Sequence, residues 1–307
     1  MLPSVSSIVE ASGLLAAAHA GGRRLRIGTD LTTDGLDRIL EHETGDLTCT
    51  VEAGIRLSSL NAILGKNGQR LSLDPPGDPT IGALLAENLS GPLRHRFGAP
   101  RDLVLGVTLV LADGTVANAG GKVVKNVAGY DLARLVCGSH GRLAFIARAS
   151  FRLHPLPRAA RTLVVETDDA ATVVARLSSS QLQPSALDVL HPGRVAVLFE
   201  GSERAAEAQL AAARELVGGS EADPDVWDES RLRQAAARGS IRFEPGRLGE
   251  TLSPLSDAVV RPAAGLAYTR DESPSGSEPQ SREASDFLPD LVRRIERELD
   301  PRGVFAT

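Results

Sequence analysis

Residues 74–91 read DPPGDPTIGALLAENLSG, a proline-rich loop that leads directly into a short apolar helix. The prolines and Gly77 make the loop rigid, Asp78 is placed to cap the helix, and Pro79 fits its first turn. Free backbone N–H groups at a helix start favour an anion, and Gly82 lets a ligand approach the backbone closely. The segment therefore predicts either an anion-binding site or, as is more common for such a loop taken alone, simple packing.

The chain has the composition of a folded protein that buries a substantial core. Its 307 residues are 42% hydrophobic and 24% charged, which fits one large domain or two smaller ones and excludes a wholly disordered chain. No apolar run approaches the ~20 residues that a membrane-spanning helix needs. The net charge of −5 argues against general nucleic-acid binding.

Cysteine and histidine are sparse and scattered. Cys49 and Cys137 form no CxxC pair, which argues against a disulfide framework, a zinc site or an iron–sulfur cluster held by this chain. The six histidines show no paired spacing, so we expect no metal site. The N-terminus lacks the basic start and apolar stretch of a secretory signal, so we expect a cytoplasmic protein with no direct membrane span.

The first half of the sequence predicts alternating strands and helices. Strands are expected at 24–27, 47–52, 105–111 and 143–153, and apolar residues at helical spacing predict a helix over 57–64. The sequence ADGT at 112–115 predicts a hairpin turn. Alternation along the last strand places five apolar residues on one face: Phe145, Ala147, Ala149, Phe151 and Leu153.

The second half predicts a small antiparallel sheet covered on one side by helices. The expected strands are 162–166, 186–190 and 194–200, and the expected helices are 170–177 and 205–217. Residues 154–157 contain two prolines and mark a boundary, whereas residues 271–285 lack large apolar side chains and predict a flexible linker. We therefore expect domains at 1–157 and 158–270, the linker at 271–285, and a C-terminal helix and tail at 286–307.

Lysine is rare in this chain and concentrated in one segment. The chain has 31 arginines but only three lysines, two of which lie in residues 120–131. This placement indicates either a need for the compact charge of lysine or chance. The polar side chains of the segment form either a ligand-contacting group or a surface loop whose aspartate caps a helix at 132–136: Lys125, Asn126, Tyr130 and Asp131.

A second glycine-containing loop lies at 135–143 and reads LVCGSHGRL. Gly138 and Gly141 flank Ser139 just before a strand, which suits either a loop that follows a ligand surface or an ordinary tight turn. Cys137 is expected to be a buried small residue rather than a nucleophile. No GxSxG elbow, P-loop or GxGxxG motif is present, so serine hydrolases, NTPases and Rossmann folds find no support.

Seven short motifs stand in order along the first half of the chain. They are VEAG at 51–54, DPP at 74–76, TIGA at 80–83, LSG at 89–91, RDLVLGV at 101–107, LADG at 111–114 and GGKVVKNVAGYDL at 120–132. Together they resemble FAD-linked oxidases of the vanillyl-alcohol-oxidase type, and the last is similar to the glycolate-oxidase branch of that family. The resemblance covers residues 20–157 and returns at 299–305, LDPRGVF.

This resemblance implies an α+β protein with a PCMH-type FAD-binding domain in two lobes, a smaller antiparallel-sheet cap domain and a returning C-terminal helix. FAD would be bound non-covalently, since the first loop holds no His or Cys. Lys125 would offset negative charge on phosphate or reduced flavin, and no catalytic residue can be assigned. The implied cofactor-binding residues are Gly28, Thr29, Pro76, Thr80, Ile81, Gly82, Ala83, Asn88, Ser90, Gly91, Lys125, Tyr130, Asp131, Gly138, Ser139, Gly141, Arg142 and Ile146.

Two loops depart from the family pattern. The long glycine-rich loop after the first strand is short here, since residues 28–30 run almost directly into 31–35. A shorter loop supplies fewer N–H donors to phosphate. In the second loop a family Thr is replaced by Arg142, which offers its own contact to phosphate, and a Gly is replaced by Ala144, which crowds the site.

The resemblance implies the FAD-binding subunit of a glycolate-oxidase-like complex that oxidises a small 2-hydroxy acid. The implied partners are a catalytic FAD subunit and an iron–sulfur subunit, through which a cytoplasmic chain would lie peripherally at the inner membrane; no nucleic acid is expected. Two alternatives stay open. One is a non-catalytic scaffold subunit with a degenerate flavin site, and the other is a stand-alone FAD-dependent oxidoreductase of unknown substrate.

Overall fold

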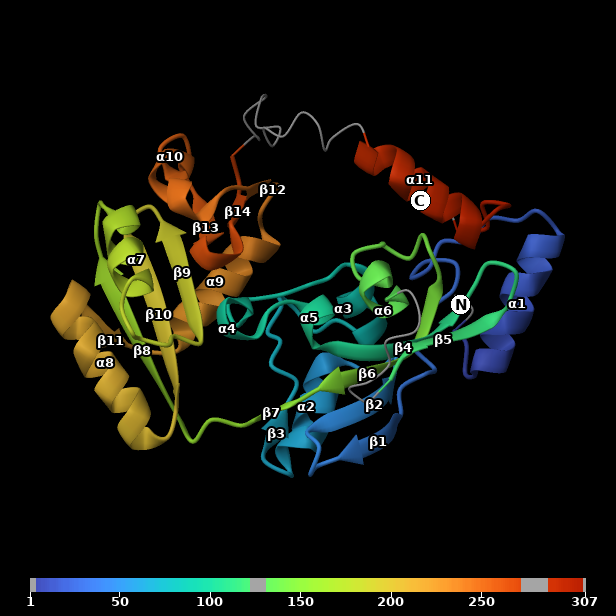
Figure 1. The fold of residues 1–307 in the computed structure, drawn as a ribbon, viewed down its shortest axis with the longest axis horizontal. Coiled ribbons are helices and arrows are strands. Elements are labelled where there is room, and N and C mark those ends of the chain that lie inside the picture. Colours follow the sequence, from blue (N-terminus) through green and yellow to red (C-terminus); the bar gives the residue numbers. More distant parts are fainter. Residues whose placement is uncertain (1–3, 122–130, 272–286, 306–307) are drawn as a thin grey trace.

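The computed structural model describes residues 4–121, 131–271 and 287–305, and it shows two large antiparallel sheets linked by residues 154–158 (Figure 1). Helices cover both sheets, and the fold is of the α+β class that the sequence predicts. We refer to the parts before and after this link as the first part and the second part.

The first part holds a five-stranded sheet of order β1-β2-β6-β4-β5 and the small pair β3–β7. Its elements are α1 (Ile8–Ala20), β1 (Ile39–Glu43), β2 (Thr48–Glu52), α2 (Leu57–Gly65), β3 (Gln69–Arg70), α3 (Ile81–Ala86), α4 (Arg94–Phe97), α5 (Pro100–Leu103), β4 (Val104–Val110), β5 (Val116–Gly120), α6 (Leu132–Val136), β6 (Phe145–Arg152) and β7 (His154–Pro155). The predicted hairpin turn joins β4 to β5, where the Leu111 N–H donates to the Thr115 carbonyl at 2.9 Å.

The central strand β6 contributes to two separate apolar cores. All five residues of its predicted inward face are buried. Ala149 and Phe151 pack in the cluster that includes α2, α3 and α6, whereas Phe145 and Ala147 pack in the cluster of α1 and Val304. A register shift between β4 and β6 at Thr108 separates the two groups, so one predicted face serves two cores.

The start of the chain differs from the prediction. Residues 24–27 are not a strand, because only isolated bridges join Leu25 to Phe305 and Ile27 to Leu31. The chain turns back at Gly28, whose φ is +86°, before a ladder can form. The helix α1 and the strand β1 were not predicted. Both have weak periodicity in the sequence, since α1 is rich in alanine and leaves Val9 82% exposed.

The second part holds a seven-stranded sheet of order β11-β8-β10-β9-β13-β14-β12. Its elements are β8 (Ala159–Glu166), α7 (Ala170–Ser178), β9 (Ala186–His191), β10 (Arg194–Gly201), α8 (Glu203–Val217), β11 (Ser220–Ala222), α9 (Asp225–Ala235), β12 (Gly239–Arg242), η1 (Pro245–Arg247), α10 (Leu248–Leu252), β13 (Ala258–Arg261), η2 (Pro262–Ala264) and β14 (Leu266–Thr269). The three predicted strands and two predicted helices are present.

Helices cover both faces of the second sheet, and the prediction of one covered side was wrong. The helices α7, α8 and α10 pack on one face. On the other face α9 buries Val226 and Trp227 against Leu190 and Val259, and it lies on the side that faces the first part (Figure 1). The sequence of α9 is mostly polar, so its periodicity gave no sign of this helix.

The chain returns to the first part at its C-terminal end. After α11 (Phe287–Leu299), the carboxylate of Asp300 accepts bonds from the Val304 and Phe305 N–H groups at 2.8 and 2.7 Å. The Val304 carbonyl then accepts a hydrogen bond from the Leu25 N–H at 2.6 Å. The side chains of Val304 and Phe305 are both buried. Among the described residues, no helix is long and apolar enough to cross a membrane.

Replacement of Asp300 by Ala is expected to destabilise the protein by roughly 3 kcal/mol or more, because it removes two hydrogen bonds to a charged group and each contributes roughly 1.5–3 kcal/mol. Urea unfolding measures the change, and Asp46→Ala at an exposed site is the matched control. A loss no larger than that of the control would show that Asp300 does not hold the C-terminal segment.

Candidate functional site

A pocket of about 270 Å³ opens beside α3, and we call it the α3 pocket. Three segments that are distant in sequence form its walls: the turn after Ile27, the helix α3 and the loop after α6. Most of its side chains are small. The lining residues are Ile27, Gly28, Thr32, Thr33, Asp34, Thr80, Gly82, Ala83, Ala86, Glu87, His140, Gly141, Ala144 and Ile146.

The start of α3 differs from the prediction in its capping residue. Thr80, not Asp78, is the N-cap, and its hydroxyl accepts from the Ala83 N–H at 3.3 Å. Asp78 instead accepts bonds from the backbone and hydroxyl of Ser58 in the first turn of α2. The proline-rich loop is thus fixed to the neighbouring helix, which places α3 against the sheet.

The N–H groups at the start of α3 already have protein partners. The Ile81 N–H donates to the Ile55 carbonyl at 2.9 Å, and the Gly82 N–H donates to the Ala53 carbonyl at 2.6 Å. A Cβ at Gly82 would lie 3.2 Å from that same Ala53 oxygen. Close packing on the strand end therefore accounts for this glycine, and α3 offers few free donors to an anion.

The first loop also uses its own donors. The N–H groups of Thr29, Asp30 and Leu31 all donate to the carbonyl of Arg26. The Asp30 carboxylate accepts from the Arg26 N–H at 2.9 Å, and this bond lowers the pKa of Asp30. The loop is a closed turn rather than an open cradle for phosphate.

Two hydrogen-bond donors of the α3 pocket have no partner among the described residues. The hydroxyl of Thr32 is buried without a hydrogen-bond partner. The N–H of Gly141, where φ is +75°, makes no hydrogen bond among the described residues. Ser139, next to the pocket, also has a buried hydroxyl without a partner.

These features fit the planar rings and the sugar hydroxyl groups of a dinucleotide better than its phosphates. The small side chains of Ala83, Ala86 and Ala144 leave room for a planar group, and the carboxylates of Asp34 and Glu87 can accept bonds from hydroxyl groups. No Lys or Arg of the described chain lines the pocket. Phosphate would therefore depend on neutral donors.

Six of the residues expected to bind the cofactor line the α3 pocket. Those six are Gly28, Thr80, Gly82, Ala83, Gly141 and Ile146. Lys125 and Tyr130 lie outside the described residues. Thr29 lies in the closed turn, Ile81 is buried in the core, and Pro76 does not line the pocket.

The remaining expected residues make contacts within the protein. Asp131 caps α6 as predicted, and Asn88 accepts a bond from the Arg101 N–H at 3.3 Å. Gly138 packs next to Asn88. Arg142 lies 3.4 Å from Glu296 of α11 and donates to the Ser139 carbonyl, so it ties the C-terminal helix to this loop.

Ala144, which was expected to crowd the site, lines the pocket. Seven further lining residues were not predicted: Ile27, Thr32, Thr33, Asp34, Ala86, Glu87 and His140. Helical spacing could have identified two of these. Ala86 and Glu87 lie four residues after Gly82 and Ala83 and so share their face of α3. The others depend on how the first loop folds, which the sequence pattern does not indicate.

Ser90 and Gly91, also among the expected residues, lie at the junction of the two parts. The Ser90 carbonyl accepts from Gln234 Nε2 at 3.0 Å and from Arg261 Nη1 at 3.4 Å. The Ser90 hydroxyl accepts from Arg94 at 3.0 Å. Burial lowers the pKa of Arg94. The second part is thus hydrogen-bonded to the backbone of this segment through the Ser90 carbonyl.

Buried charges surround this junction. Arg261 is 2% exposed, lies 3.6 Å from the fully buried Asp188 and donates to Gln234 at 2.7 Å. Asp74 accepts from the Leu93 N–H at 3.0 Å and lies 3.5 Å from Arg231. Burial raises the pKa of Asp74 to about 7, and it also raises the pKa of Asp188.

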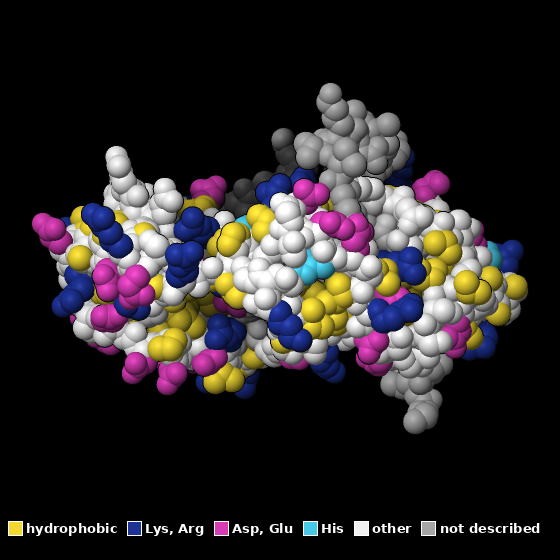
Figure 2. Space-filling model, turned by 90° about the horizontal axis from the view of Figure 1, so that it is seen from below, with side chains coloured by type: hydrophobic (Ala, Val, Ile, Leu, Met, Phe, Trp, Pro, Cys, Tyr) yellow, Lys and Arg dark blue, Asp and Glu magenta, His cyan; other side chains and the backbone are white. Residues whose placement is uncertain are grey.

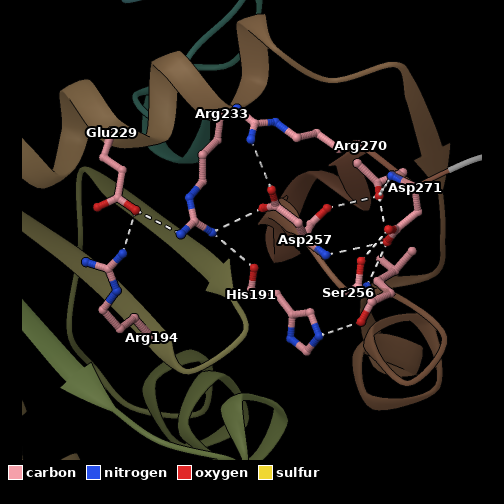
Figure 3. Close-up of polar contacts among 10 residues, drawn as sticks. His191, Arg194, Glu229, Arg233, Ser256, Asp257, Arg270 and Asp271 are labelled. Atoms are coloured by element: carbon pink, nitrogen blue, oxygen red, sulfur yellow. Dashed lines mark hydrogen bonds and ion pairs between the residues drawn. The ribbon is translucent and has the colours of Figure 1, made fainter.

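A second charge network lies within the second part (Figure 3). Glu229 lies between Arg194 and Arg233, at 2.5 and 2.9 Å, and Asp257 lies between Arg233 and Arg270, at 3.4 and 3.5 Å. Three arginines alternate with two carboxylates, so each carboxylate lies between two positive charges, which is typical of a structural network.

The end of the described second part is fixed beside this network (Figure 3). Asp271 accepts bonds from the backbone and hydroxyl of Ser256 and from Thr269, and these bonds lower the pKa of Asp271 to about 2. The chain therefore leaves the second sheet from an anchored position.

Neither cysteine is placed for nucleophilic chemistry. Burial raises the pKa of both Cys49 and Cys137 to about 12. Both therefore remain thiols at neutral pH, which agrees with the prediction for Cys137.

Part of the chain matches a known domain family. Residues 16–120 match the family described as FAD binding domain. The glycolate oxidase subunit GlcE of Escherichia coli is 34% identical over 201 residues, which cover 64% of this chain and 56% of that protein. The glycolate oxidase subunit GlcD of Bacillus subtilis is 35% identical, over 56% of this chain and 39% of that protein.

The chain is also similar to a D-lactate dehydrogenase in sequence and to an alkyldihydroxyacetonephosphate synthase in structure. The mitochondrial D-lactate dehydrogenase [cytochrome] 1 of Saccharomyces cerevisiae is 32% identical, over 54% of this chain and 29% of that protein. Thus the chain matches only about half or less of the length of these relatives. The structure of an alkyldihydroxyacetonephosphate synthase covers 99% of this chain and 75% of its own, with a TM-score of 0.73 and 15% identity, which shows a shared fold.

Replacement of Asp74 by Asn is expected to make the protein progressively more stable, relative to the unchanged protein, as the pH rises from about 4 to about 7. The folded protein holds a proton on Asp74 up to about pH 7, whereas the unfolded chain loses it near the model value of 3.8. The stabilising contribution of this proton is therefore present below pH 3.8 and is lost as the pH rises through about 7.

Urea unfolding at several pH values tests this expectation. The gain of the variant should approach about 1.4 kcal/mol per pH unit within the window, and Asn retains the bond from Leu93. Asp168→Asn at an exposed site controls for the loss of one negative charge. A constant difference between Asp74→Asn and the unchanged protein across this pH range would contradict the assignment.

Proposed function

Residues 16–120 are an FAD-binding domain, and from this premise we propose that the chain is the FAD-binding subunit of a complex that oxidises a small 2-hydroxy acid. The observation that carries the proposal is the 34% identity over 201 residues to a protein named as a glycolate oxidase subunit. Further relatives are named D-lactate dehydrogenases. Glycolate and lactate are both short 2-hydroxy acids, which supports this substrate class.

The α3 pocket is where this chain would hold part of the cofactor. Thr32 and the Gly141 N–H would donate hydrogen bonds, and the face of Gly82, Ala83 and Ala86 would lie against the ligand. Bound FAD would accept the electrons of the substrate, while the protein orients it and sets its surroundings. The flavin would be held non-covalently.

The chain would depend on partners for the rest of the reaction. No combination of a histidine base and an arginine clamp for a 2-hydroxy acid stands out among the described residues. The word subunit in the names of two relatives supports a multi-subunit assembly. We propose a catalytic FAD subunit and an iron–sulfur subunit as partners, in the cytoplasm or peripherally at the inner membrane.

A second candidate function is a scaffold subunit with a weak flavin site. The observation that favours it is the use of donors within the protein: the first loop donates to Arg26, and the start of α3 donates to Ala53 and Ile55. No cation of the described residues lines the α3 pocket. A dinucleotide would then lack the usual partners for its two phosphates.

Flavin binding separates the two functions. The proposed function predicts flavin absorbance of the purified chain, or a rise in melting temperature with added FAD. Replacement of Ala86 by Phe would fill the α3 pocket from its helical wall and is expected to weaken FAD binding at least tenfold. Ala212→Phe, at an exposed site of α8, is the matched control and should bind FAD normally.

Two results would overturn the proposal. The first is an absence of flavin and of FAD-dependent stabilisation, both for the isolated chain and after co-expression with its partners. The second is flavin binding by a complex that reduces no acceptor dye with glycolate or D-lactate. The first result favours the scaffold function, whereas the second excludes the proposed substrate class.

A further inference from the structure

A larger pocket of about 410 Å³ lies where the two parts of the chain are linked, and we call it the hinge pocket. It shares no lining residue with the α3 pocket. Arg and Lys side chains lie along the junction between the left lobe, which is the second part, and the rest of the molecule (Figure 2). The lining residues that carry the argument are Arg70, Arg96, Phe97, His154, Ser185 and Glu200.

Three polar atoms around the hinge pocket are buried without partners. Ser185 is completely buried and its hydroxyl makes no hydrogen bond. Arg70 Nε and His154 Nδ1 are likewise buried and unpartnered. Buried polar atoms in folded proteins nearly always have a partner. Three such atoms around one pocket therefore point to a polar group that is bound there.

The charges of the hinge pocket favour an anion. Glu200 accepts from both terminal nitrogens of Arg70, at 2.9 and 2.6 Å, and balances its charge. Arg96 and Arg158 add two further positive charges. Burial, together with the positive charge of Arg70, lowers the pKa of His154, so its ring is neutral at neutral pH. The hinge pocket is thus positively charged within a chain of net charge −5.

The side chain of Phe97 organises these groups. The Arg70 and Arg96 guanidinium carbons lie 5.4 and 5.9 Å from its ring centre, and the His154 ring lies 4.6 Å from it. Such contacts restrict the arginine side chains before a ligand arrives, which lowers the entropy lost on binding.

We propose that the hinge pocket binds a small molecule through an oxyanion group, either a carboxylate or a phosphate. Arginine presents a planar fork of donors that matches both groups. Arg96 and Arg158 meet the charge, and the Ser185 hydroxyl and Arg70 Nε donate to the oxygens. The volume falls within the ~300–1,000 Å³ of small-molecule sites.

The ligand would contact both parts of the chain. Arg70, Arg96 and His154 belong to the first part, whereas Ser185 and Glu200 belong to the second. Binding would therefore stabilise the link between them. Nothing in this proposal depends on FAD.

Calorimetric titration of the full chain with sodium phosphate, and separately with sodium acetate, tests the proposal. Sodium chloride at matched ionic strength is the control for salt. We expect saturable binding of at least one anion, and the two titrations show which group the site takes. Arg96→Gln should weaken binding at least tenfold, whereas Arg176→Gln, an exposed change on α7, should leave it unaltered.

A pair of serine variants separates ligand binding from folding. Ser185 and Ser72 are both completely buried with unpartnered hydroxyls, but only Ser185 lines the hinge pocket. Removing an unpaired hydroxyl should raise the melting temperature of Ser185→Ala and of Ser72→Ala in buffer without these anions. Only Ser185→Ala should lose the further rise that the bound anion produces.

The proposal is overturned if neither anion binds beyond the chloride control. It is also overturned if Arg96→Gln and Ser185→Ala retain the affinity of the unchanged protein.

Discussion

The arrangement of the two sheets depends on the close approach of Gly91 to Asp74. A Cβ at Gly91 would lie 1.8 Å from the Asp74 carbonyl oxygen, so no other residue fits there. This approach presents the preceding carbonyl, that of Ser90, to Gln234 and Arg261 of the second part. A single peptide group thereby connects the backbone of the first part to the buried charge pair of Arg261 with Asp188.

The same tight packing shapes the α3 pocket. Carbonyl groups of Arg26, Ala53 and Ile55 take the N–H donors that a phosphate would need. What remains is a pocket with one free N–H, a free hydroxyl and the carboxylates of Asp34 and Glu87, and no cation of the described residues lines it. A cofactor bound in this pocket would be held largely through shape and through contacts to its hydroxyl groups. The chain thus has the fold of its structural relatives but few free N–H groups that could donate hydrogen bonds to a phosphate.

Sequence patterns predicted the elements whose signal is local. The β4–β5 turn, the alternation of β6 and the cap at Asp131 all follow from neighbouring residues. Thr80 rather than Asp78 caps α3 because the Asp78 carboxylate accepts a hydrogen bond from Ser58, which lies in α2. The helix α9 is mostly polar, so its sequence gives no amphipathic pattern. Only the folded structure shows that Val226 and Trp227 pack against the sheet. Likewise, the α3 pocket brings together three distant segments. Of the six expected residues that line it, only Thr80, Gly82 and Ala83 lie within one of the seven motifs.

The pairing of Leu25 with the segment at Val304 and Phe305 affects how the protein is made. The second sheet is built from the continuous stretch 159–269 and can close as soon as that stretch has left the ribosome. The core around α1 includes Val304 and Phe305 and therefore stays incomplete until late in synthesis. The first part therefore completes its core only after the whole second sheet has been synthesised.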